Sequence, residues 1–163
     1  ADSVLVISDD KKAGATYLDS TTGDYIIDAY TSHMQARGYS RVANKNEAAY
    51  GLQISFVEST YYYTKSPSWW SDYPWYWTPS YWWPWYNGIW YHPYPFIYSY
   101  NAGSIVGEMV DITAITPTTA TSKPTIIWNS YITDIGDITP KNESKVANAI
   151  GQAFTQSPYL KYQ

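Results

Sequence analysis

The feature that most constrains the fold of this sequence is a run of aromatic and proline residues in the middle of the chain. Between Tyr61 and Tyr100, 20 of 40 residues are aromatic (11 Tyr, 8 Trp and 1 Phe), and six of the ten prolines lie there too. Proline removes backbone donors and interrupts helices and central strands. We therefore predict that residues 64–96 form a long irregular loop.

The surface that these rings would occupy is too large for a lone soluble particle to display. Twenty aromatic side chains, at about 150–250 Å² each, represent on the order of 4,000 Å². A folded chain of this mass exposes roughly 8,000 Å² in total, and apolar patches on soluble monomers rarely exceed about 300–600 Å². We expect the rings to pack on one another or the sheet, on a protein partner or second copy, at a membrane interface, or on a carbohydrate.

Composition narrows the class of protein. The length of 163 residues fits one α+β domain over residues 1–163 with the loop inserted. A net charge of −4 argues against nucleic-acid binding. The sequence lacks Cys and holds two His, which excludes disulfides and disfavours a metal site, so no cofactor is implied. It also lacks an apolar run long enough to cross a membrane as a helix.

Both flanks of the loop show the patterns of regular secondary structure. Residues 3–8 and 52–56 alternate as strands do, and the second strand is expected to continue through Tyr61–Tyr63. Residues 104–114 and 125–135 are joined by a Thr- and Pro-rich turn, which predicts an antiparallel hairpin.

Two helices are expected. Over residues 24–37, apolar side chains recur every three or four positions, with Thr22 as a possible N-cap and Gly38 as the stop. A second helix follows Thr139-Pro140, with Val146, Ile150 and Phe154 on one stripe. Because both helices need one apolar surface, the predicted fold class is α+β: an antiparallel sheet with two helices on one face and a long Trp/Tyr/Pro-rich loop insertion.

Several segments, taken together, resemble a known family. They are Ala36-Arg-Gly-Tyr39, residues 52–57, residues 103–111, Ile127-Trp128 and residues 153–160. In this order, with the aromatic loop between them, they resemble the envelope lipoproteins known as domain of unknown function 4136. The resemblance implies a location at the Gram-negative outer membrane, with a lipid anchor outside this chain, and it implies no reaction. The resemblance also implies that a strand of the family precedes the point where this chain starts. A strand from another molecule could then pair with the sheet edge that this strand would occupy.

The residues do not favour an enzyme. Neither His33, expected on a helix surface, nor His92 in the loop lies in a nucleophile motif. Glu108 and Asp111 are three apart on a predicted strand and should face opposite sides. The acidic groups at residues 8–10 and 134–137 lack the regular oxygen spacing of a calcium loop, and the latter flank a glycine as turn residues do.

The residues predict a non-catalytic structural or protein-binding module that acts through its aromatic loop, and the family resemblance implies that it is a cell-envelope lipoprotein domain. Self-association is a further expectation. The sequence does not determine the identity of the partner or the side of the outer membrane on which the domain lies. The alternative is a cell-surface glycan-binding protein with stacked rings, beside which Lys65, Asp72, Asn87 and His92 would be the polar groups. Asp2-Ser3 and Asp19-Ser20 resemble short O-glycosylation signals. The expected anchors are Trp69, Trp70, Trp75, Trp77, Trp82, Trp83, Trp85 and Trp90.

Overall fold

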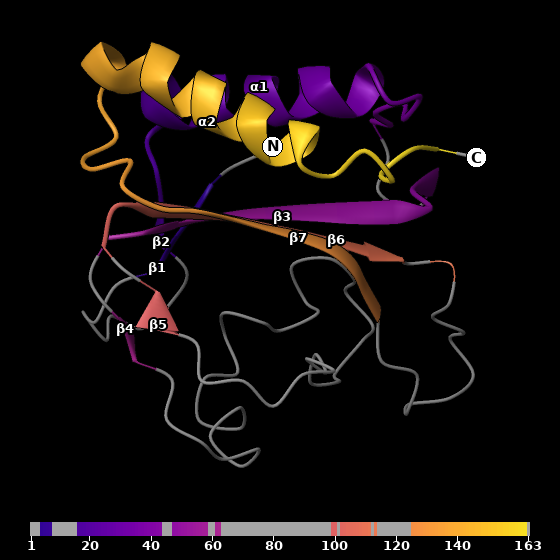
Figure 1. Ribbon diagram of the computed structural model, residues 1–163, viewed down its shortest axis with the longest axis horizontal. Coiled ribbons are helices and arrows are strands. Elements are labelled where there is room, and N and C mark those ends of the chain that lie inside the picture. The colour runs from indigo at the N-terminus through magenta and orange to yellow at the C-terminus, as the bar shows by residue number, and fades with distance from the viewer. Residues whose placement is uncertain are drawn as a thin grey trace.

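The computed structural model describes residues 4–7, 16–43, 47–58, 61–62, 99–100, 102–111, 113 and 125–162. In this part of the chain, two helices cover one face of a five-stranded sheet (Figure 1). The sheet has the order β2-β1-β3-β6-β7, made of β1 (Leu5–Ile7), β2 (Thr16–Tyr17), β3 (Tyr50–Val57), β6 (Ser104–Asp111) and β7 (Thr125–Ile132). The helices are α1 (Ser20–Gln35) and α2 (Glu143–Thr155), and a short second sheet pairs β4 (Tyr61–Tyr62) with β5 (Ser99–Tyr100).

The α+β class is confirmed, and so is the antiparallel pairing of three strands. β3 pairs with β6 and β6 with β7, both antiparallel, which confirms the predicted hairpin. The expectation of a wholly antiparallel sheet is wrong at β1, which runs parallel to β3. The chain between these two strands passes through β2 and α1, and such a crossover returns a strand in the same direction. β1 also pairs with β2, so it is flanked on both sides.

Several predicted boundaries differ from the structure. The helix predicted to start at Thr139-Pro140 begins at Glu143, because Pro140–Asn142 form a separate short 3-10 helix, η3. The strands predicted to reach residues 114 and 135 end at Asp111 and Ile132.

β3 ends at Val57, and Tyr61–Tyr62 belong to the separate β4–β5 sheet, so the predicted continuation of this strand is wrong. Helix α1 begins at Ser20, and its N-cap is Asp19, whose Oδ1 accepts a hydrogen bond from the Thr22 backbone N–H at 3.0 Å. The first turn buries Thr22 and Gly23 rather than large apolar residues, so hydrophobic periodicity missed it.

The end of α1 matches the prediction. Gly38 has a φ of +91°, in the left-handed region that favours glycine. Its N–H bonds to the Gln35 carbonyl at 3.0 Å, while the Tyr39 N–H bonds to the Met34 carbonyl at 3.2 Å. These two bonds form a Schellman motif, which satisfies carbonyls that the helix leaves unpaired.

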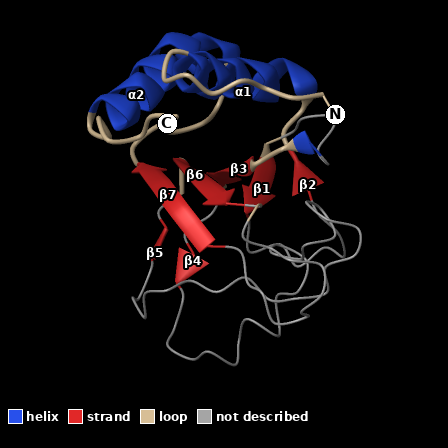
Figure 2. Cartoon of the chain, turned by 90° about the vertical axis from the view of Figure 1, so that its right-hand side faces the viewer, coloured by secondary structure: helices blue, strands red, loops and turns tan. Residues whose placement is uncertain are grey.

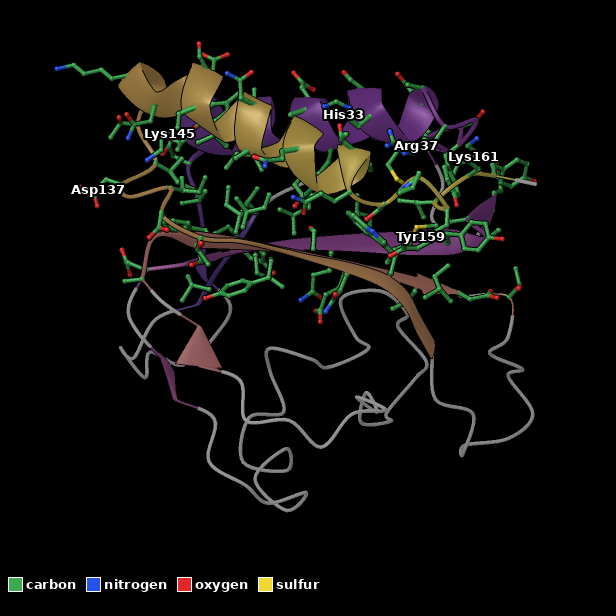
Figure 3. All side chains as sticks on the ribbon, in the orientation of Figure 1. His33, Arg37, Asp137, Lys145, Tyr159 and Lys161 are labelled. Atoms are coloured by element: carbon green, nitrogen blue, oxygen red, sulfur yellow. The ribbon has the colours of Figure 1, made fainter. Side chains whose placement is uncertain are left out.

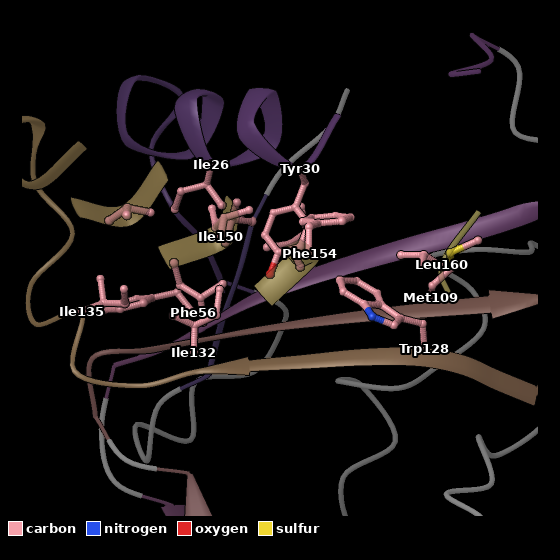
Figure 4. Packing of buried hydrophobic residues seen from close by; sticks show 14 residues of the cluster. Ile26, Tyr30, Phe56, Met109, Trp128, Ile132, Ile135, Ile150, Phe154 and Leu160 are labelled. Atoms are coloured by element: carbon pink, nitrogen blue, oxygen red, sulfur yellow. The ribbon is translucent and has the colours of Figure 1, made fainter. Parts of the chain in front are cut away.

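The core lies between the helices and the sheet, as Figure 4 shows. The predicted stripe of α2 is confirmed, because Val146, Ile150 and Phe154 are all buried. Tyr30 of α1 lies at the centre, edge-on to Phe154 with ring centroids 5.7 Å apart. Each large side chain buried in this way contributes roughly 1.5–3 kcal/mol. The same layer contains Ile26, Ile54, Phe56, Ile105, Met109, Trp128, Ile132, Ile135 and Leu160.

Candidate functional site

The aromatic segment, defined here as residues 63–98 between β4 and β5, leaves the frame and returns to it at one place. Tyr61 pairs with Tyr100, and Tyr62 with Ser99, in an antiparallel ribbon. The β3–β6 ladder closes just before this ribbon, with Val57 opposite Ser104. Figures 1 and 2 show β4 and β5 on the side of the large sheet that faces away from the helices. The frame therefore directs both ends of the segment to its helix-free side.

A tight backbone contact fixes this junction. Gly103 donates its N–H to the Val57 carbonyl at 2.8 Å and accepts from the Ile135 N–H at 2.9 Å. Its φ is +71°, and a Cβ at this position would lie 2.9 Å from the Gly136 backbone nitrogen. Glycine is required here because other residues rarely adopt a positive φ and because a side chain would overlap the Gly136 backbone. The start of β6 is thus held against the loop that follows β7.

The predicted anchors lie outside the described residues. This applies to all eight tryptophans and to Lys65, Asp72, Asn87 and His92 of the glycan alternative, whose roles stay predictions. It also applies to Asp2-Ser3 and to residues 8–10. Of the two short glycosylation-like signals, Asp19-Ser20 is described, and Asp19 is the N-cap of α1.

A row of polar side chains crosses the helix-free face of the sheet. Gln53 of β3 is the ladder partner of Glu108 of β6, which is in turn the partner of Asn129 of β7. Opposite residues share a sheet face, and Leu52, Ile54 and Phe56 of β3 face the helices. Gln53, Glu108 and Asn129, here called the polar row, therefore lie on the other face. They combine a carboxylate with two carboxamides, which can accept and donate hydrogen bonds.

The helix-free face is divided into a buried and an exposed part. Glu108 is only 2% exposed although its side chain ends in a polar carboxyl group, and Asn129 is exposed. Along β7, Ile127 and Tyr131 are each 42% exposed, and Ser104 donates a hydrogen bond to the Tyr131 hydroxyl at 3.4 Å. We call Ile127, Asn129 and Tyr131 the β7 strip. The buried neighbours of the polar row are Ser55, Val57, Ser104, Val106 and Val110.

The polar row and the β7 strip place hydrogen-bonding groups next to an exposed aromatic ring. An exposed aromatic ring next to amide groups can hold a ligand by stacking and by hydrogen bonds. Sequence reasoning considered Glu108 only together with Asp111, and it missed the grouping with Gln53 and Asn129 because the three residues are far apart in the chain. The alternation of each strand identifies its faces, but the register that aligns the three comes only from the structure.

His33 is more enclosed than a helix-surface residue. Its ring stacks on Phe154 of α2, with centroids 5.0 Å apart and planes 20° apart. Burial lowers its pKa below the usual value, and the nearby Arg37 guanidinium lowers it further. Arg37 also donates to the Phe154 carbonyl at 2.6 Å, which ties the C-terminal ends of α1 and α2 together. Figure 3 shows His33 and Arg37 along this helix seam, so His33 has a packing role.

The acidic candidates are separated from one another. Asp111 accepts hydrogen bonds from the Thr113 N–H and hydroxyl at 2.8 and 2.6 Å, which closes a turn after β6, whereas Glu108 lies in the polar row. Asp134 and Asp137 are exposed turn residues, as predicted, and Asp134 has a φ of +61°. Within the described ranges, no three His, Asp or Glu side chains gather in a way that could hold a metal ion.

A helix pair on one face of a mixed sheet, with the β4–β5 ribbon on the opposite side, defines a small α+β frame. The family model described as "Domain of unknown function (DUF4136)" matches residues 7–159, and the chain belongs to this family. The chain is similar to a DUF4136 family protein from Bacteroides thetaiotaomicron, known from a crystal structure, with 42% identity and a TM-score of 0.79. The match covers 99% of this chain and 86% of the other.

No curated protein sequence matches the chain. In the described part of the structure, neither helix has the length and apolar character needed to span a membrane.

Proposed function

We propose that this protein is a non-catalytic binding module of the bacterial cell envelope that holds a protein partner through its aromatic segment. A lipid anchor at the Gram-negative outer membrane is part of this proposal and rests on the family resemblance. The observation that supports the binding role most directly is the β4–β5 ribbon, which gathers both ends of the segment on the helix-free side.

The chemistry of the segment favours a protein partner. Trp and Tyr are the residues most enriched at the energetic centres of protein interfaces, because they bury large areas at small entropic cost. Eight of the nine tryptophans of the chain lie in the segment. Trp128 is the exception, and it is buried in the core with its indole nitrogen bonded to Ser157 at 2.9 Å.

Site-specific photocrosslinking in the native envelope tests this role. A photoreactive aromatic residue would replace Trp70 or Trp82 in separate variants of the full chain. The matched control carries the same residue at Tyr159, a 72% exposed aromatic of the frame. We expect one discrete adduct from the tryptophan positions and not from the control. Equal adducts from all three positions would contradict a segment-specific partner.

Removing the segment separates binding from folding. We expect a variant in which a short Gly/Ser linker replaces residues 66–95 to unfold cooperatively, because the described core draws its residues from the helices, the large sheet and the segments that flank them. The same variant should lose the crosslinked partner. Loss of cooperative unfolding, measured by circular dichroism, would show instead that the segment builds the core.

Glycan binding is the second candidate, and the polar row is the observation that favours it. Asn129, the exposed member of the polar row, lies on the same strip as Tyr131 and provides a carboxamide that can hydrogen-bond sugar hydroxyls next to a stacking ring. Calorimetry with common bacterial polysaccharides should then detect binding that Asn129→Ala weakens, with Asn148→Ala on the exposed face of α2 as the control. Absence of heat with every polysaccharide counts against this candidate.

A further inference from the structure

β7 is an edge strand with few of the features that protect edges. In the described sheet, the order β2-β1-β3-β6-β7 leaves β7 at one edge and the two-residue β2 at the other. Natural edge strands are usually short or carry charges or proline, which discourage pairing with another chain. β7 has eight residues, and residues 125–133 (Thr-Ile-Ile-Trp-Asn-Ser-Tyr-Ile-Thr) include no charged residue and no proline.

The sequence of this edge is partly palindromic about Asn129: the two outer pairs are identical, whereas Trp128 is the counterpart of Ser130. Two positions away, Ile127 corresponds to Tyr131, and the outer pairs are Ile with Ile and Thr with Thr. An antiparallel pair of identical strands around a two-fold axis places each residue opposite its palindromic counterpart. Asn129 would face its own copy, and Ile127 would face Tyr131. Aromatic–β-branched and amide–amide pairs of this kind stabilise neighbouring strands.

We propose that a second copy of this chain pairs with β7 in antiparallel register, with the two-fold axis at Asn129. This interaction is independent of the aromatic segment and goes beyond the proposed function. The side chains brought together on the helix-free face are the two β7 strips. All three members of each strip are uncharged and at least partly exposed, so pairing creates no charge repulsion within the strips.

The geometry of β7 also sets the strength of the association. Met109 pairs with Trp128 but Val110 pairs with Ile126, so Ile127 is an extra, bulged residue. A bulge increases local twist and interrupts pairing. The ladder between copies should therefore be regular around Asn129 and loosen towards its ends. One short ladder falls below the roughly 1,000 Å² expected of a stable interface, so we expect a reversible dimer in the micromolar range.

Sedimentation equilibrium of the full chain over a range of concentrations tests the proposal. We expect reversible monomer–dimer behaviour for the natural sequence. Asn129→Lys places two ammonium groups opposite each other at the axis and should weaken dimerisation about tenfold or more. Asn129→Glu should do the same through two carboxylates. Asn148→Lys, the same substitution on the exposed face of α2, should leave the dimer unchanged.

A mixture of the two charged variants gives the decisive measurement. We expect the Asn129→Lys and Asn129→Glu variants to dimerise with each other, because an ammonium group and a carboxylate then meet at the axis. Circular dichroism confirms that each variant is folded. The proposal is overturned if the natural chain stays monomeric at every concentration, if Asn129→Lys dimerises normally, or if the mixture forms no heterodimer.

Discussion

Gly103 and Gly136 have almost the same backbone conformation but different surroundings, which allows strain and crowding to be separated. Their φ angles are +71° and +74°. A Cβ on Gly103 would lie 2.9 Å from the Gly136 nitrogen, whereas a Cβ on Gly136 meets nothing within 4 Å. We expect Gly136→Ala to lower the free energy of unfolding by about 1–2 kcal/mol, because of the left-handed backbone conformation alone. Gly103→Ala should lower the free energy of unfolding by clearly more, because the added Cβ would also overlap the Gly136 backbone. Urea unfolding of both variants measures the difference, and equal losses would show that crowding at the junction is unimportant.

Tyr30 and Ser130 form a buried hydrogen-bonded pair at the centre of the core. Their oxygens are 3.0 Å apart, and burial raises the pKa of Tyr30 to about 12, so the hydroxyl stays protonated at neutral pH. Tyr30→Phe leaves the Ser130 hydroxyl unsatisfied, which should cost about 1–3 kcal/mol.

Ser130→Ala in the same chain provides the control for this pair. We expect the double variant to be more stable than the sum of the two single losses indicates, because no unpaired hydroxyl then remains. Additive losses in urea unfolding would show that the two oxygens are not energetically coupled.

At the scale of the helices, Asp19 determines where α1 begins. Its carboxylate accepts from the Thr22 N–H, and the hydrogen bonds with Thr22 hold its pKa below the usual value. Asp19→Ala should lower the melting temperature by a few degrees, while Asp19→Ser should retain most of the cap. Asp28→Ala, an exposed acidic position within the same helix, is the matched control. If Asp28→Ala has the same effect, helix capping is not the cause.

The seam between α1 and α2 should make stability depend on pH through His33. Burial and Arg37 lower its pKa in the folded protein from 6.5, so the unfolded chain binds this proton more tightly. The contribution of His33 is complete above its unfolded pKa and is lost as the pH falls towards the folded pKa. We expect His33→Gln to reduce the change in melting temperature between about pH 7.5 and about pH 5. An unchanged difference would assign the pH dependence to other groups.

Most of the helices and strands could be predicted from the sequence, but some of their ends and directions could not. Alternation located β3, and the stripe of Val146, Ile150 and Phe154 located α2 through its one buried face. The Thr- and Pro-rich turn between two strand-length segments located β6 and β7, although β6 is buried on both faces and shows no one-sided pattern. The first turn of α1 was missed because it buries Thr22 and Gly23, small residues that leave no hydrophobic signal. The direction of β1 depends on how the chain crosses the sheet, which no local pattern encodes.

For the whole molecule, the sequence itself shows that the aromatic residues are concentrated between Tyr61 and Tyr100, and the structure adds that β4 and β5 flank them. The polar row could not be predicted, because strands from three parts of the chain supply Gln53, Glu108 and Asn129. The partial palindrome around Asn129 is visible in the sequence, but it has meaning only once β7 is known to be an edge strand.

The junction at Val57 and Ser104 has an evolutionary consequence. These two residues are ladder neighbours, so residues 58–103 form an excursion of the chain that starts and ends at the same point of the frame. For a flexible chain, the entropic cost of such an excursion rises by only about 0.6 kcal/mol for each doubling of its length. Selection can therefore lengthen, shorten or rewrite the excursion while the helices and the large sheet keep their arrangement. A frame of this kind can accept a different insertion at the same point without a new fold.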